Sequence, residues 1–162
     1  MKKMMKIALV AGFFGLMLSC TKSDSGGTGC TNVPVEKDAD TIQSYITQHQ
    51  LENVFKDASG LYYQVLQPGT GAYPTVSSEI KIKYKGYFLN GNVFDQNQDA
   101  ASTGWILSTL IPGWQVGIPK INRGGTIRLF VPSALGYGCR GSGSVIPPNT
   151  VLLFDVELVD FK

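Results

Sequence analysis

The alternation of apolar and charged residues between positions 80 and 85 constrains the fold of this chain more than any other feature. The apolar members are Ile80, Ile82 and Tyr84, and the charged members are Lys81, Lys83 and Lys85. Successive side chains of a β-strand point to opposite faces, so a period of two predicts a half-buried strand. We interpret the lysine face as solvated rather than as a binding patch.

Strand patterns recur in three other segments, at residues 61–66, 126–131 and 151–161. In the last of them, one face of the strand would be formed by Leu152, Phe154, Val156 and Leu158. Asn90-Gly91, followed by Val93-Phe94, predicts a hairpin with a two-residue turn. Pro112 fits the first turn of a short helix that runs to Ile118. Several antiparallel strands and one short internal helix predict an α+β domain over residues 59–162.

The chain before this domain shows a helical and a linker pattern. Residues 38–58 are predicted to form a helical segment, capped by Asp40 or Thr41 and ending near Phe55. Its apolar positions are Ile42, Tyr45, Ile46 and Val54. The single histidine, His49, lies in this pattern and is expected to face solvent. Residues 20–37 are polar and glycine-rich, which predicts a flexible tether.

The first nineteen residues have the pattern of an export signal. Three lysines, at positions 2, 3 and 6, precede an apolar run over residues 7–18, which ends at Ser19-Cys20. The run is short for a permanent membrane helix. It resembles a bacterial lipoprotein signal peptide cleaved before Cys20, which would carry the lipid. An uncleaved anchor and an ordinary signal peptide are the alternatives.

Charge and cysteine content exclude some functions and leave a disulfide open. The formal net charge is +2, and removal of the three signal lysines lowers it to −1. A nearly neutral protein has no electrostatic basis for binding nucleic acid. Cys30 and Cys139 could form a disulfide in an exported chain, or remain two unpaired thiols. No Cys/His spacing suits zinc, and no cofactor is expected.

Aromatic and branched apolar residues recur on several segments with few polar groups among them. They are Tyr84, Phe94-Asp95, Ile111-Pro112-Gly113-Trp114, Gly136-Tyr137-Gly138, Ile146-Pro147-Pro148 and Phe154. No nucleophile, histidine base or metal-ligand set accompanies them. Such a site can hold a planar polar group in a twisted geometry, as rotation about an X-Pro peptide bond requires. The barrier of roughly 18–20 kcal/mol comes from lost amide resonance, so a catalyst must bind the twisted amide better than the planar one.

One short motif is rejected as a dinucleotide site. Gly136-x-Gly138-x-x-Gly141 matches the dinucleotide fingerprint, which must open a helix whose N-terminus binds pyrophosphate. Here the motif is followed by residues 142–148, which cannot form that helix because they contain Pro147-Pro148.

From about Gly60 to Lys162 the chain resembles the FKBP-type peptidyl-prolyl isomerases. The matching motifs occur in order and are Lys83-Tyr84-x-Gly86-Tyr87, Gly91-Asn92-Val93-Phe94-Asp95, Leu110-Ile111-Pro112-Gly113-Trp114, Gly136-Tyr137-Gly138, Ile146-Pro147-Pro148-Asn149 and Leu153-Phe154-Asp155-Val156-Glu157-Leu158. The resemblance implies a bent antiparallel β-sheet wrapped around one short α-helix, with a proline pocket between them.

The resemblance also implies a role for each pocket residue. Trp114 would form the floor under the proline ring, and Tyr84, Phe94 and Phe154 its aromatic walls. The other expected apolar contacts are the rim residues Leu110 and Ile111, the loop tip Ile146 and the aromatic Trp105.

Three polar groups are expected to act on the twisting amide. The backbone N–H of Ile111 and the hydroxyl of Tyr137 would donate hydrogen bonds, and Asp95 would bring a carboxylate near the amide. Residues 96–104 contain no arginine where family members often pair one with the aspartate, so Asp95 is expected to be less firmly oriented. Ser142 and Leu135 replace a histidine and a tyrosine of some members, which should alter substrate preference.

The resemblance implies a monomeric isomerase of proline-containing polypeptides that FK506-like macrolides inhibit. With lipid on Cys20, it would be anchored in the bacterial cell envelope and assist the folding of exported proteins. Two alternatives stay open: a binding module or chaperone without useful turnover, and an anchored scaffold whose pocket holds one fixed partner.

Overall fold

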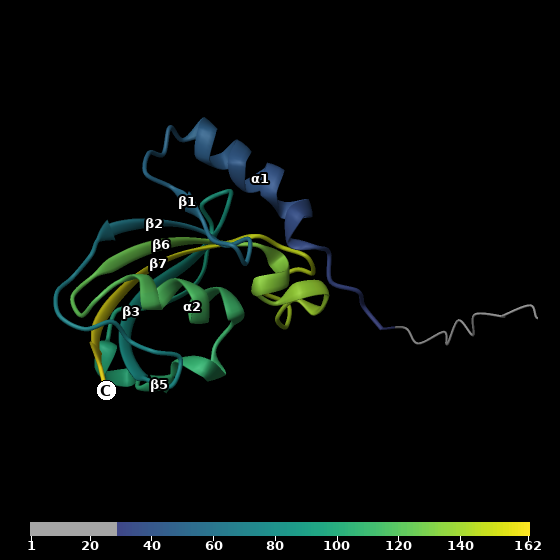
Figure 1. Ribbon diagram of the computed structural model, residues 1–162. Helices are drawn as coiled ribbons and strands as arrows, with labels where there is room; N and C mark the ends of the chain where they lie inside the picture. Colours follow the sequence, from purple (N-terminus) through teal and green to yellow (C-terminus); the bar gives the residue numbers. More distant parts are fainter. Residues whose placement is uncertain (1–28) are drawn as a thin grey trace, which may run out of the picture.

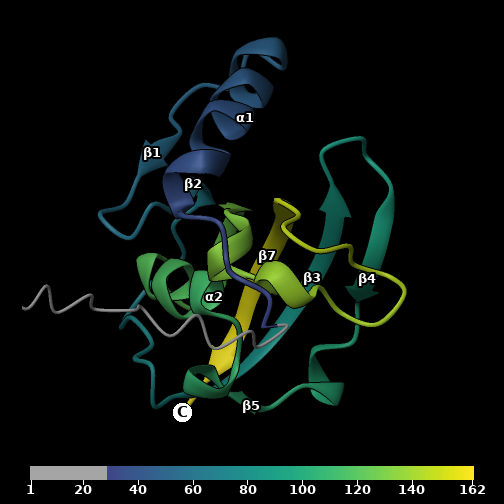
Figure 2. The ribbon, with the colours of Figure 1, turned by 90° about the vertical axis from the view of Figure 1, so that its right-hand side faces the viewer.

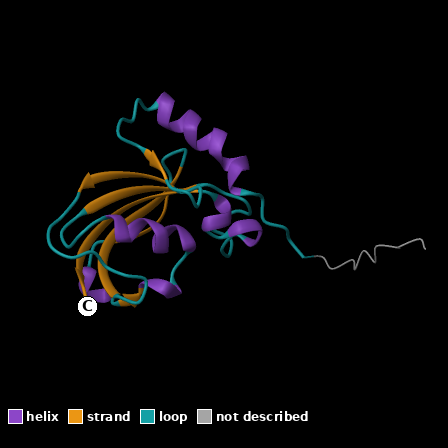
Figure 3. Ribbon diagram, viewed as in Figure 1, coloured by secondary structure: helices purple, strands orange, loops and turns teal. Residues whose placement is uncertain are grey.

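One antiparallel sheet curves around a short helix, and a second helix lies outside the curve (Figures 1 and 3). The computed structural model describes residues 29–162, so the expected signal peptide and Cys20 lie outside the described part. The strands are β1 (Phe55–Lys56), β2 (Tyr62–Gln67), β3 (Glu79–Phe88), β4 (Val93–Asn97), β5 (Trp105–Ile106), β6 (Thr126–Val131) and β7 (Leu152–Phe161). The α-helices are α1 (Val35–Gln48) and α2 (Pro112–Gly117). Short 3-10 turns are η1 (Ala100–Ser102), η2 (Leu107–Thr109), η3 (Ile118–Lys120), η4 (Ser133–Leu135) and η5 (Gly138–Arg140).

The strand order places the C-terminal strand in the middle of the sheet. The order is β1-β2-β6-β7-β3-β4, and β5 pairs with the start of β3 beyond the end of β4. All the pairs are antiparallel. The register of β3 shifts against β7 after Lys81 and against β4 after Gly86. Such irregularities bend a strand, which helps β3 to follow the curve around α2.

Both faces of the sheet are covered by apolar side chains. The concave face packs with α2 in the larger core, whose buried members include Ile82, Trp114, Leu129 and Phe154. The convex face packs against α1 in a smaller core that contains Ile42, Ile46 and Phe130. On β7 the two cores alternate, because Leu152 and Phe154 belong to the first and Leu153 to the second. An antiparallel sheet with α2 on its concave face and α1 on its convex face confirms the predicted α+β class.

Glycines on α2 allow the helix to lie close to the sheet. A Cβ atom at Gly113 would lie 2.6 Å from Cγ1 of Val131, and one at Gly117 would lie 2.5 Å from Cδ2 of Leu129. Both glycines are buried. Pro112 opens the helix, as predicted, and the following turn η3 prolongs it to Lys120. The short helix thereby fixes Trp114 against the concave face.

The predicted strands are confirmed, and β3 shows why its pattern was informative. Ile80, Ile82 and Tyr84 are buried, whereas Lys81 and Lys85 are exposed. The third lysine of that face, Lys83, forms an ion pair with Glu157 at 3.4 Å. The predicted strand 126–131 has the bounds of β6, and the last strand begins one residue later than predicted.

Two predicted boundaries are wrong, both for local reasons. The first helix begins at Val35 behind Pro34 rather than at a cap on Asp40 or Thr41, and it ends at Gln48 rather than near Phe55. Gln50 and Asn53 have positive φ angles, which break the helix, and Phe55 lies on strand β1. His49 is exposed, as predicted, and stacks on Tyr45.

The hairpin between β3 and β4 has a longer turn than predicted. A two-residue type I′ turn needs positive φ at both central residues, but only Gly91 of the pair Asn90-Gly91 has one. Its N–H donates to the carbonyl of Phe88, and the N–H of Phe88 donates to the carbonyl of Asn92. The side chain of Asn90 accepts from the N–H of Asn92 instead. Asn90 therefore shapes the turn through its side chain.

The two remaining cysteines are bonded to each other. Cys30 and Cys139 form a disulfide that joins residues 109 positions apart in the sequence. In Figure 2 the segment before α1 runs past the turns that follow β6, where Cys139 lies. The alternative of two unpaired thiols is wrong.

Candidate active site

A cavity of about 400 Å³ opens on the concave face, between α2 and the strands. Nine residues line it: Tyr84, Asp95, Trp105, Thr109, Leu110, Ile111, Trp114, Tyr137 and Phe154. They come from β3, β4, β5, η2, α2, β7 and the irregular segments before α2 and after η4. The curvature of the sheet is what brings these distant segments to one place.

Three aromatic rings at right angles form the inner wall of the cavity. The ring of Trp114 meets that of Phe154 edge to face, with centroids 5.1 Å apart, and that of Tyr84 at 5.2 Å. Trp105 stands beside Tyr84, with centroids 6.1 Å apart. Edge-to-face pairs hold their rings in fixed orientations. A rigid apolar wall of this shape suits a flat or ring-shaped apolar group.

The carboxylate of Asp95 is held by a tyrosine. The hydroxyl of Tyr84 donates a hydrogen bond to Oδ2 of Asp95 over 2.7 Å. Burial, and then this bond, raise the pKa of Tyr84 well above its ordinary value. This bond gives Asp95 a fixed partner in place of an arginine, and the expectation that Asp95 is less firmly oriented than in family members with an arginine stays a prediction. Tyr84 and Asp95 lie on paired strands, so β3 and β4 fix the contact through the sheet.

Tyr137 lines the same cavity as Asp95 and lies near enough to be affected by its charge. Its pKa is raised above the ordinary value, first by burial and then by the negative charge of Asp95. Tyr137 lines the cavity and is nevertheless 38% exposed to solvent. The phenol stays protonated at neutral pH and can donate a hydrogen bond to a bound carbonyl.

The rim segment before α2 is fixed by a side chain that sequence reasoning did not select. Nε2 of Gln115 donates to the carbonyl of Leu110 at 2.7 Å and to that of Ser108 at 3.2 Å. The carbonyl of Ile111 accepts the N–H groups of Trp114 and Gln115, while its own N–H donates to no group among residues 29–162. A free N–H at the cavity rim can bind a substrate carbonyl.

The family follows from these residues and from their order along the chain. The family model described as FKBP-type peptidyl-prolyl cis-trans isomerase matches residues 71–159, more than half of the chain. The chain belongs to this family.

Curated FKBP-type relatives are similar over the same region. FkpA of Escherichia coli strain K12 is 39% identical over 112 residues, which are 68% of this chain and 41% of the relative. The peptidyl-prolyl cis-trans isomerase Mip of Coxiella burnetii is 38% identical over 65% of this chain and 46% of the relative. The outer membrane protein MIP of Legionella longbeachae is 37% identical over 64% and 45%. The chain thus matches less than half the length of these relatives.

Solved structures confirm the FKBP-like fold. The crystal structure of FkpA from Escherichia coli has a TM-score of 0.66 at 35% identity, over 79% of this chain and 62% of that one. A peptidyl-prolyl cis-trans isomerase from Pseudomonas syringae has a TM-score of 0.67 at 28% identity, over 82% and 98%. Within residues 29–162, neither helix is long and apolar enough to cross a bilayer.

The FKBP cavity gathers eight of the ten residues expected in it, and two lie elsewhere. Phe94 packs behind the wall, where its ring meets Phe154 edge to face at 5.5 Å. Ile146 is buried in the main core and does not line the cavity. Thr109 lines it and was not selected, because a single threonine at the end of a 3-10 turn carries no distinguishing sequence pattern.

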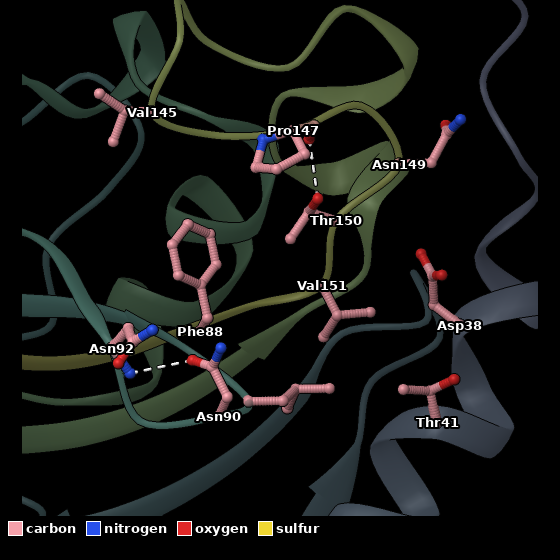
Figure 4. A pocket seen from close by; sticks show the side chains of 11 residues that line it. Asp38, Thr41, Phe88, Asn90, Asn92, Val145, Pro147, Asn149, Thr150 and Val151 are labelled. Atoms are coloured by element: carbon pink, nitrogen blue, oxygen red, sulfur yellow. Dashed lines mark hydrogen bonds between the residues drawn. The ribbon is translucent and has the colours of Figure 1, made fainter.

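A second hollow lies on the other side of the loop before β7 (Figure 4). It measures about 550 Å³ and is bordered by the first turns of α1, the β3–β4 turn and the segment 145–151. Its lining mixes apolar side chains such as Phe88 and Val151 with amides such as Asn90 and Asn92. It has no aromatic wall like that of the FKBP cavity, so the candidate active site is the cavity around Trp114.

Proposed function

We propose that this chain is a peptidyl-prolyl cis-trans isomerase that acts on proline-containing polypeptides. The observation that carries the proposal is the wall of Tyr84, Trp114 and Phe154 beside a tyrosine-held carboxylate. FKBP membership supports the same reaction. An apolar wall favours the twisted amide, which is less polar than the planar one, because it removes the amide from water.

The proposed mechanism uses fixed hydrogen bonds and no covalent step. The proline ring packs on Trp114, and the N–H of Ile111 and the hydroxyl of Tyr137 donate to carbonyls of the bound peptide. Asp95, held by Tyr84, places negative charge near the rotating amide. Donors that are already oriented stabilise the twisted geometry without reorganising. FK506-like macrolides should compete for the same wall.

A coupled assay tests this proposal directly. The full chain, purified in mild detergent, is added to a peptide whose trans X-Pro form alone is cleaved by a protease, and the rate of the slow phase is measured. We expect acceleration that FK506 suppresses. Trp114→Leu keeps a large apolar side chain but removes the indole wall, so it should lose most of the activity. If the folded wild-type chain leaves the slow phase unchanged, the protein is a binding module instead.

We further propose that the isomerase is anchored in the bacterial envelope through a lipid on Cys20, where it assists the folding of exported proteins. The charged and apolar pattern before Cys20 supports export, and the Cys30–Cys139 disulfide is typical of an oxidising compartment. Growth with a labelled fatty acid should mark the wild-type protein and leave Cys20→Ala unmarked. Equal labelling of both proteins would show that Cys20 carries no lipid.

A further inference from the structure

Tyr137 projects from a segment that has no strand or helix ladder of its own. It lies between the 3-10 turns η4 and η5, in a stretch that connects β6 to the loop before β7. Gly136 and Gly138 flank it, and Gly138 has a φ of 56°. A side chain on such a segment needs outside contacts to keep its hydroxyl directed at the cavity, because productive geometry tolerates only about 0.5 Å of displacement.

One outside contact precedes Tyr137 in the sequence and comes from α1. Oδ2 of Asp38 accepts hydrogen bonds from both the N–H and the hydroxyl of Ser133, each over 2.7 Å. Asp38 is 8% exposed and Ser133 is fully buried. Figure 4 shows Asp38 on α1, at the side of the helix that faces the second hollow. A buried carboxylate with two short bonds fixes η4 firmly to the helix.

The other contacts follow Tyr137 and come from the residues before α1. Cys139 is bonded to Cys30 through the disulfide, and its N–H donates to Oδ1 of Asn32 over 2.8 Å. The side-chain amide of Asn32 occupies the space where a Cβ atom on Gly138 would lie. Two separate attachments therefore hold the chain on either side of Tyr137, and both come from residues 30–38.

We propose that residues 30–38 are a positioning clamp for Tyr137, in which Cys30, Asn32 and Asp38 set the direction of its hydroxyl. The clamp lies outside residues 71–159, the region that the family model matches. The inference rests on the proposed isomerase function, since Tyr137 is taken to donate to the substrate. Its rival is that the same contacts only stabilise the fold.

A double-mutant cycle separates the two explanations. The full chain is prepared in mild detergent as the wild type, as Cys30→Ala with Cys139→Ala, as Tyr137→Phe, and as all three changes together. Without the disulfide we expect kcat/KM to fall about three- to tenfold, and by no more than Tyr137→Phe itself costs. In the Tyr137→Phe background the same cysteine changes should cost less than twofold. Asp38→Asn should follow the same pattern.

Asp57→Asn serves as the control, because the side chain of Asp57 forms an ion pair with Lys120 and accepts a hydrogen bond from the N–H of Ser59, and neither partner belongs to residues 132–141. It should leave kcat/KM within twofold in both backgrounds. If the cysteine changes lower kcat/KM equally with and without the Tyr137 hydroxyl, the clamp is overturned and the contacts have a purely structural role. The clamp is also overturned if the cysteine changes leave kcat/KM of the otherwise wild-type protein unchanged.

Hydrogen exchange decides the clamp even if the wild type proves inactive, in which case the proposed function has failed separately. The amides of residues 137–141 should exchange faster once the disulfide is removed, while those of β7 should not. Unchanged exchange at residues 137–141 would show that the segment keeps its position without the disulfide, and the clamp would be rejected.

Discussion

Tyr84 contributes to the candidate site both a ring face and a hydrogen bond. Its ring packs on Trp114, and its hydroxyl holds Asp95. Tyr84→Phe keeps the ring and frees the carboxylate, so we expect kcat/KM to fall about tenfold, as for loss of a hydrogen bond to a charged group. Stability should change little because Asp95 is exposed to water. Isomerase assays and urea unfolding of the two proteins provide the check, and an unaltered kcat/KM would show that Asp95 needs no support.

The raised pKa values of Tyr84 and Tyr137 predict how activity depends on pH. Burial, followed by the bond to Asp95, raises the pKa of Tyr84, and burial followed by the charge of Asp95 raises that of Tyr137. Both phenols therefore stay protonated, and able to donate, beyond the pH of about 10 at which an ordinary tyrosine ionises. We expect kcat/KM to stay level from pH 7 to 10. A decline centred below pH 10 would show that one of them ionises like a solvent-exposed tyrosine.

Gly86 lies directly beneath two of the aromatic rings. A Cβ atom there would lie 2.6 Å from Cζ of Phe94 and 2.9 Å from Cε1 of Phe154. Gly86→Ala should displace both rings, lower the free energy of unfolding by about 1–3 kcal/mol and weaken macrolide binding. Lys85→Ala, at the exposed neighbouring position, should change stability by less than about 0.5 kcal/mol. Urea unfolding and calorimetric titration measure both effects, and similar results for the two variants would contradict the packing argument.

Most residues of the site could be predicted from the sequence, and the exceptions have physical reasons. The aromatic residues stand in ordered motifs, so Tyr84, Trp114 and Phe154 were identifiable. The bond that holds Asp95 was not, because its donor lies eleven positions away on a paired strand. Nor was the role of Gln115, whose contact with the rim depends on the path of the chain before α2.

Among the elements, strands were predicted more accurately than helix ends. Alternation in β3 records burial directly, since one face touches the core and the other meets water. The start of α1 follows tertiary contact instead, because the helix buries Asp38 against Ser133 before its first buried apolar residue, Ile42. The N-cap candidates Asp40 and Thr41 therefore predicted the wrong N-terminal boundary for α1.

The turn between β1 and β2 is joined to η3 by an ion pair that should respond to acid. Lys120, by a hydrogen bond, and then the N–H of Ser59 lower the pKa of Asp57 from 3.8 to about 2. The unfolded chain binds a proton near pH 4, so the pair stabilises the folded state above that pH and its contribution is lost as the pH falls from about 4 to 2.

Asp57→Asn should accordingly lower the free energy of unfolding by about 1 kcal/mol at pH 7, after allowance for solvent screening. The difference from the wild type should vanish near pH 2. Urea unfolding at a series of pH values measures it. Glu157→Gln, which removes the more exposed pair with Lys83, should have an effect below about 0.5 kcal/mol. A constant difference between Asp57→Asn and the wild type down to pH 2 would mean that the pair does not titrate as described.

At the scale of the whole molecule, the disulfide closes most of the domain into one loop. It joins residues 109 positions apart, so it restricts the unfolded chain strongly. Replacing both cysteines by alanine should lower the free energy of unfolding by about 2–4 kcal/mol. Urea unfolding of the variant, and of the wild type treated with a dithiol reductant, should give matching midpoints below that of the oxidised protein. Coincident midpoints for all three samples would refute a stabilising role.

The central position of β7 decides when this protein can fold. Strand β3 pairs with β7 as far as Phe161, and β6 pairs with β7 on its other edge, so the sheet consists of two unconnected parts until residues 152–161 exist. Pairings this distant in sequence make folding slow, on the scale of milliseconds to seconds. A fragment that ends at residue 151 should therefore remain open to proteases, and stable folding should require residues 152–161 to be present.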